Sequence, residues 1–152
     1  LPDALSAGDR ALADGLLNRD EVGWVLSQLG SIRGVRLASQ ALHLLDPRRE
    51  TALESWSYAT FTSWRIPLPE MQVEICDESG LIGRVDFYWP DHGVVGEADG
   101  RLKYDEPRAL YEEKRREDRL RARGLTVVRW GWSDLAREQT SLKSRIAAAL
   151  SR

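Results

Sequence analysis

Cysteine, methionine and histidine are scarce in this chain. Its 152 residues include one cysteine, Cys76, one methionine and two histidines. One cysteine cannot form an intrachain disulfide, and so few Cys and His side chains exclude a zinc site built mainly from those ligands. Any metal centre must therefore depend on oxygen ligands.

Long apolar runs are missing as well. No stretch approaches the roughly 20 apolar residues of a membrane-spanning helix. The first residues, LPDALSAGDR, lack the basic and apolar regions of a signal peptide. We therefore expect a cytoplasmic protein. Because residue 1 is leucine rather than methionine, we also expect an upstream domain that this chain does not include.

The net charge of −2 conceals an uneven distribution. Residues 1–100 contain 8 Lys and Arg against 16 Asp and Glu, whereas residues 101–152 contain 14 against 8. Such asymmetry is typical of nucleic-acid-binding proteins, in which basic groups attract phosphates and acidic groups hold cations. A solvated, charged helix explains the same counts equally well.

The pattern of residues 1–46 predicts two or three short helices that form a linker or small bundle. Asn18 precedes two acidic residues, which is a signal for the start of a helix. Trp24, Val25 and Leu29 have the spacing of a buried helical stripe. Asp46-Pro47 then marks a boundary, so we expect a second domain over residues 47–152.

The pattern of residues 47–152 predicts a helix, three strands, a helix, a strand and a helix, in that order. This is an α/β (α+β) arrangement. The expected segments are a helix over 51–64, strands over 71–76, 81–89 and 94–98, a helix from 107 to 124, a strand over 125–130 and a helix from Ser133 to Leu150. A helical crossover joins the last two strands and makes them parallel, so the sheet should be mixed.

The two apparent hairpins gather carboxylates on one face of this sheet. If Trp89 and Val94 form the last pair of the second hairpin, Asp86 stands opposite Glu97. Asp99 follows two residues after Glu97 and shares its face. Like charges in such positions destabilise a sheet, and a hard cation such as Mg²⁺ or Mn²⁺ would remove the repulsion.

The first hairpin should bring a polar residue to the same place. A three-residue loop, 78–80, would pair Asp77 with Leu81 and place Gln72 across from Asp86. On the opposite face the alternation puts Val85, Phe87 and Trp89 together. Gln72 is therefore expected to support the acidic site.

These residues resemble the PD-(D/E)xK nuclease superfamily, in the branch related to very-short-patch repair endonucleases. The resemblance depends on a glutamate in a leading helix, the segment Val-Asp-Phe, the run Glu-x-Asp-Gly-x-x-Lys and a later Gly-Leu-Thr-Val-Val-Arg-Trp, which begin at Glu54, Val85, Glu97 and Gly124. It implies a restriction-endonuclease-like core. The chain also resembles actinobacterial proteins with an upstream winged-helix region that are often grouped with AbiEi-type antitoxins.

The resemblance implies a metal-dependent DNA endonuclease, a hydrolase of phosphodiester bonds. Asp86 and Glu97 would bind Mg²⁺ or Mn²⁺, Glu54 would assist, and a lysine would position the attacking water. The usual pattern has that lysine two residues after the second acid, where this chain has Asp99. Either Lys103 supplies the missing positive charge or Asp99 is an additional metal ligand.

DNA is the expected partner, and the helix that follows the acidic strand is the expected contact. Its candidate phosphate-binding residues are Arg108, Lys114, Arg115, Arg119 and Arg121. The alternative is a non-catalytic DNA-binding regulator, or an antitoxin-like protein, that kept a degenerate nuclease fold. Carboxylates that hold no metal reduce stability, which favours the nuclease.

Overall fold

The computed structural model describes residues 1–99 and 107–151. Its contacts divide the chain into two compact units, Leu1–Ser63 and Trp64–Arg152. This division falls later than the boundary that we predicted after residue 46. Within the described ranges, no helix has both the length and the apolar character needed to cross a membrane.

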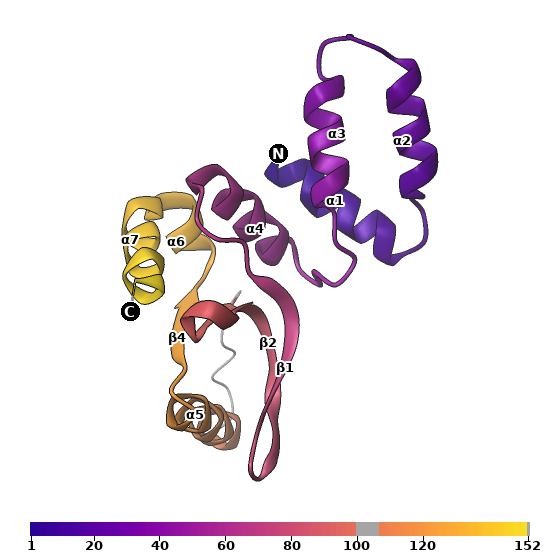
Figure 1. Ribbon diagram of the computed structural model, residues 1–152. Helices are drawn as coiled ribbons and strands as arrows, with labels where there is room; N and C mark the ends of the chain where they lie inside the picture. The colour runs from indigo at the N-terminus through magenta and orange to yellow at the C-terminus, as the bar shows by residue number, and fades with distance from the viewer. Residues whose placement is uncertain (100–106, 152) are drawn as a thin grey trace. The chain divides into compact units, whose positions relative to one another are not determined.

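The first unit is helical (Figure 1). Its helices are α1 (Pro2–Ala13), α2 (Arg19–Gln28), α3 (Val35–Leu44) and α4 (Ala52–Trp64). The side chain of Asn18 accepts hydrogen bonds from the backbone N–H groups of Asp20 and Glu21, at 2.9 and 3.3 Å. The predicted cap at the start of α2 is therefore confirmed, because this side chain satisfies two donors that lack intrahelical partners.

The apolar core of this unit contains Leu5, Ala41, Leu45 and Ala59. The predicted stripe on α2 is not part of it, since Trp24, Val25 and Leu29 are 66%, 48% and 41% exposed. The prediction was wrong because helical spacing shows which residues share a face but not which face meets a neighbour. Helix α2 packs on α3 through a different face.

A buried ion pair connects parts of the first unit that lie far apart in the sequence. Arg49 donates to both carboxylate oxygens of Asp9, at 2.6 and 2.8 Å. The same carboxylate accepts hydrogen bonds from the Ser55 hydroxyl and the Asp46 backbone N–H, each at 2.7 Å. These contacts join α1 to the segment before α4 and to α4 itself, and no sequence pattern indicated them.

The second unit is built on a four-stranded mixed sheet, which confirms the α+β prediction at that level. Its strands, in spatial order, are β1 (Glu70–Asp77), β2 (Gly80–Trp89), β3 (Val94–Ala98) and β4 (Thr126–Trp130). Strand β2 is antiparallel to both β1 and β3, whereas β3 and β4 are parallel, as the crossover predicted. A short 3₁₀ helix, Pro90–His92, connects β2 to β3.

Three helices pack against this sheet (Figure 1). They are α5 (Pro107–Ala122), α6 (Trp132–Arg137) and α7 (Gln139–Leu150). Our prediction of one continuous final helix is wrong, because the structure has two helices there. Glu138, with a φ of −119° and a ψ of 32°, separates α6 from α7. Asp134 fixes the start of α6, because its carboxylate accepts the backbone N–H of Gly131 at 2.9 Å.

The strand registers agree with prediction near the acidic residues and differ at one loop. Trp89 pairs with Val94, and Val73 pairs with Val85, as expected. Asp77 pairs with Gly80 rather than with Leu81, because a bulge shifts the register beyond Ile75. Gly80 adopts a φ of +102°, which glycine tolerates readily.

The two faces of β2 do not follow simple alternation. Val85 belongs to a core cluster with Val95 and with Leu120 of α5, whereas Phe87 packs against Trp89 and Trp130. Our prediction that Val85 and Phe87 share a face is therefore wrong. The break lies where Gln72 of β1 adopts a left-handed φ of +55°, which interrupts the regular pleat beside Asp86.

Gly96 positions β3 between two aromatic residues. A Cβ atom at Gly96 would lie 2.6 Å from an atom of the Trp130 indole and 3.1 Å from Phe87 Cβ. The indole can therefore lie across β3 only where that strand has no side chain. Because Glu97 follows directly, this packing also fixes the backbone that carries one of the candidate carboxylates.

Candidate functional site

The predicted acidic residues of the hairpin line one small pocket of about 190 Å³. The lining consists of Asp86, Glu97, Ala98, Asp99, Glu113, Arg116 and Arg129. The last pair between β2 and β3 is formed by Phe87 and Gly96. Asp86 and Glu97 are the next residues along the two strands, just beyond that pair. Asp86 Oδ2 accepts the backbone N–H of Ala98 at 2.8 Å. Its carboxylate thereby occupies the point where the two strands separate.

Gln72 contacts Asp86, as its register position predicted. Gln72 Nε2 lies 3.4 Å from Asp86 Oδ1, at the long end of hydrogen-bond distances. The left-handed backbone of Gln72 is found at the same place. A non-glycine residue in that conformation is costly and is retained where its surroundings hold it. The unusual backbone of Gln72 therefore accompanies the contact between its amide and the Asp86 carboxylate.

Glu97 is the electrostatically perturbed member of the pocket. Its side chain is only 12% exposed. Burial raises its pKa to about 7, and repulsion from the Asp86 carboxylate adds to this effect, while the Arg116 guanidinium opposes it. At neutral pH Glu97 is therefore close to half-protonated, and a bound cation would favour its ionised form.

Three charged residues in the pocket were missed by the sequence analysis. Arg116 of α5 donates to Glu97 Oε1 at 2.7 Å and to the backbone oxygen of Arg84 at 2.9 Å. Arg129 of β4 pairs with Glu97 in the parallel register and forms an ion pair with Glu113. The predicted parallel pairing of the last two strands could have indicated that Arg129 lies beside Glu97. Which residues of α5 reach the pocket depends on how the helix packs on the sheet, which the sequence does not show.

The guanidinium of Arg129 is incompletely satisfied. Burial lowers its pKa, but the ion pairs to Glu113 and Glu117 outweigh that effect, so the pKa is raised overall. Its Nε atom is buried and, within the described part of the chain, has no hydrogen-bond partner. Arg129 therefore stays charged and presents an unused donor.

The donor set suits a hard cation that needs few protein ligands. Within residues 1–99 and 107–151, no three His, Cys, Asp or Glu side chains form a group that could hold a metal. Asp86 and Glu97 are nevertheless oxygen donors that line the same pocket and repel each other. Mg²⁺ is commonly held by one or two carboxylates, with water and substrate phosphates as its other ligands. The role of Asp99 as a further ligand stays a prediction.

Two predicted catalytic residues remain, Lys103 and Glu54. Lys103 is outside the described residues. Glu54 belongs to the first unit, where its side chain is buried at the start of α4. Its carboxylate accepts hydrogen bonds from the Thr51 hydroxyl at 2.7 Å and the Glu50 backbone N–H at 3.1 Å. This is a helix-capping arrangement, and an additional catalytic role stays a prediction.

The predicted phosphate-binding residues of α5 differ in their surroundings. Arg121 forms an ion pair with Glu117, and Arg119 forms one with Asp77. Lys114 and Arg115 are exposed, and the Arg115 guanidinium lies 6.0 Å from the Tyr111 ring centre. The side chain of Arg108 lies outside the described part of the chain. Four acidic residues offset the six basic ones on this helix.

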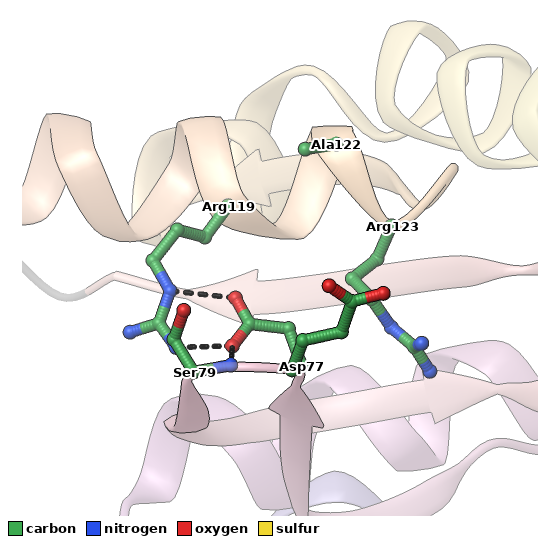
Figure 2. Close-up of a pocket in the computed structure, with 6 residues that line it drawn as sticks. Asp77, Ser79, Arg119, Ala122 and Arg123 are labelled. Atoms are coloured by element: carbon green, nitrogen blue, oxygen red, sulfur yellow. Dashed lines mark hydrogen bonds and ion pairs between the residues drawn. The ribbon is translucent and has the colours of Figure 1, made fainter.

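Arg119 closes the tip of the first hairpin onto α5. Figure 2 shows its guanidinium beside the Asp77 carboxylate, with both hydrogen bonds at 2.7 Å. Asp77 also accepts the backbone N–H of Ser79 at 2.8 Å. A pocket of about 460 Å³ lies here, lined in part by Arg123. It is larger than the acidic pocket, and the ion pair of Asp77 with Arg119 lies within it.

Asp77 should contribute to stability in a pH-dependent manner. The hydrogen bonds from Arg119 hold its pKa at about 2, below the ordinary value of 3.8. A lowered pKa means that this contribution is present above about pH 4 and is lost as the pH falls through about 2. We expect the melting temperature of Asp77→Asn to fall less between pH 4.5 and 2.5 than that of the unmodified chain. Equal decreases in circular dichroism melts would contradict this.

Comparisons with known proteins identify relatives but no function. No family model matches the chain, and no solved structure matches it. The chain is similar to two proteins of Mycobacterium tuberculosis, uncharacterized protein MT2308 of strain CDC 1551 / Oshkosh and uncharacterized protein Rv2248 of strain H37Rv. Each is 32% identical over 151 residues, which is 99% of this chain and 56% of the relative. The chain thus spans about half the length of the curated relatives it matches.

Proposed function

We propose that this chain is a metal-dependent DNA endonuclease of the PD-(D/E)xK type, with a restriction-endonuclease-like core similar to that of very-short-patch repair endonucleases. One observation carries the proposal. Two carboxylates, Asp86 and Glu97, line one pocket at the point where their strands separate, and burial, with added repulsion from Asp86, raises the pKa of Glu97 to about 7. A divalent cation would turn this repulsion into coordination.

In this proposal each residue of the pocket has a distinct task. Asp86 and Glu97 hold Mg²⁺ or Mn²⁺, which supplies an activated water and stabilises charge that develops on the phosphate. The Ala98 N–H donates to Asp86 Oδ2 and Gln72 Nε2 lies 3.4 Å from Oδ1, so the Asp86 carboxylate is held in one orientation. Arg129 lines the same pocket and would neutralise charge there, and among the described residues its Nε has no hydrogen-bond partner. Lys103 orients the water, and Glu54 assists.

DNA binding is assigned to the exposed part of α5. Lys114 and Arg115 are exposed. Phosphate contacts from such side chains supply affinity without sequence information. Arg119 and Arg121 contribute less, since carboxylates already occupy their guanidinium groups. Contacts of this kind give little base specificity, so another part of a longer protein would have to select the sequence.

The decisive experiment compares the full chain with Asp86→Ala. We expect the unmodified chain to bind Mn²⁺ in calorimetric titration and to nick supercoiled plasmid DNA when Mn²⁺ or Mg²⁺ is present. Asp86→Ala should lose both properties but keep its fold and its affinity for a DNA duplex, because the substitution relieves repulsion and leaves α5 unchanged. Nicking that survives this substitution would remove Asp86 from the mechanism.

The alternative function is a non-catalytic DNA-binding regulator or antitoxin-like protein. One observation favours it, since Arg116 already compensates the charge of Glu97 without a metal. Duplex binding without any Mn²⁺ binding would support this alternative. Lys114→Gln, which leaves the carboxylates intact, separates the activities, because it should weaken DNA binding and leave Mn²⁺ affinity unchanged.

A further inference from the structure

Arg116 is the most completely engaged cation in the acidic pocket. Its guanidinium contacts Glu97 Oε1 at 2.7 Å, the backbone oxygen of Arg84 at 2.9 Å and Glu113 Oε1 at 3.3 Å. The side chain is only 20% exposed. Three acceptors on β2, β3 and α5 thus hold one planar group, which restricts its orientation.

The backbone of β2 leaves a place for this side chain. A Cβ atom at Gly83 would lie 2.7 Å from Arg116 Nε and 3.4 Å from its Cδ. Any other residue at position 83 would therefore have to displace the arginine from its path across the strand. Arg116 can therefore extend from α5 to Glu97 because residue 83 is glycine.

Arg116 contacts one of the two carboxylate oxygens of Glu97. The guanidinium hydrogen bond goes to Oε1. A carboxylate fixed through one oxygen can coordinate a cation with the other, and hydrogen-bond partners of this kind orient the ligands of metal sites. Asp86 is held by the Ala98 N–H at Oδ2 and by Gln72 Nε2, 3.4 Å from Oδ1.

We propose that Arg116 is a positioning residue, which orients Glu97 so that its second oxygen can bind the divalent cation. This inference rests on the proposed function. It assigns to α5 a role in building the metal site that differs from phosphate binding. Removal of Arg116 should weaken metal binding by about 10- to 100-fold, the usual effect of losing a partner that orients a metal ligand.

Arg119 provides a matched control on the same helix. It also forms a hydrogen-bonded ion pair with a strand carboxylate, at the same 2.7 Å, but its partner is Asp77 at the hairpin tip. If Arg116 only fastened α5 to the sheet, Arg116→Gln and Arg119→Gln would lower the melting temperature similarly and leave metal affinity alone.

The test is calorimetric titration of Mn²⁺ alone into the full chain, Arg116→Gln, Arg116→Lys and Arg119→Gln, with a melting curve of each metal-free protein. We expect weaker Mn²⁺ binding in Arg116→Gln, partial recovery in Arg116→Lys and unchanged affinity in Arg119→Gln. Equal affinity in all four proteins would overturn the positioning role. Tighter binding by Arg116→Gln would also overturn it, since the arginine would then be a competitor. If the unmodified chain binds no Mn²⁺, the proposed function fails and this inference fails with it.

Discussion

Glu97→Gln is expected to make the metal-free protein more stable at pH 8 by about 2–3 kcal/mol, since one pKa unit corresponds to about 1.4 kcal/mol. Burial and the neighbouring Asp86 raise the pKa of Glu97 from an ordinary 4.5 to about 7. The stabilising effect of the bound proton is complete below about pH 4.5 and is lost as the pH rises through about 7. Glutamine keeps the shape and the acceptor for Arg116 but removes the charge.

Denaturant unfolding with a chelator present, at pH 5.5 and at pH 8, measures this effect. The unmodified chain should lose stability between the two pH values, and Glu97→Gln should lose less. Glu74→Gln is the control, because Glu74 is an exposed strand residue whose replacement should change stability by no more than about 0.5 kcal/mol. Identical pH dependence in the unmodified chain and Glu97→Gln would contradict the argument. Added Mn²⁺ should stabilise the unmodified chain and not this variant.

This expected gain in stability is a physical argument for a functional site. A carboxylate that costs free energy in the folded, metal-free protein has no structural benefit of its own. Natural sites retain such groups where function needs them, and replacing them commonly stabilises the protein. Glu97 fits this description because burial and the nearby Asp86 carboxylate raise its pKa.

The hairpin that carries these carboxylates was predictable from the sequence because it is local. Turn residues 90–93 lie between two apolar segments, so the pair Trp89 and Val94 followed from the pattern, and the position of Asp86 relative to Glu97 followed from that pair. The register near Val73 and Val85 was predictable for the same reason. Turn chemistry acts over a few residues and leaves few alternatives.

The rest of the site depends on contacts that no local pattern encodes. Arg116 reaches Glu97 only because α5 packs on the sheet at a particular rotation, and Gly83 leaves room for it. The left-handed backbone of Gln72 was also unpredictable, because glutamine rarely adopts a positive φ. Beside it, Val85 departs from the face that Phe87 and Trp89 share, which simple alternation did not predict.

Asp9→Ala is expected to destabilise the first unit by about 3–5 kcal/mol, the cost of leaving a buried charge without its partner. The side chains of Asp9 and Arg49 are each only 1% exposed. Besides Arg49, this carboxylate accepts hydrogen bonds from Ser55 and from the Asp46 backbone. Its removal would leave the buried guanidinium, among the described residues, with only the backbone oxygen of Leu44 as an acceptor and without a counter-charge, and would take an acceptor from two further donors.

Asp14→Ala, at the C-terminal cap of α1, is the matched control. Asp14 also forms an ion pair, with Arg10 at 2.7 Å, but the two side chains are 38% and 75% exposed. Exposed pairs contribute about 0–1 kcal/mol, so Asp14→Ala should change the free energy of unfolding little. Arg49→Met combined with Asp9→Leu should be less destabilising than either single change, because the double variant leaves no buried charge. If the single and double variants instead had additive effects, the two side chains would not act as a coupled pair. Coupling would mean that residues 46–55 are held to α1 by charge as well as by apolar packing.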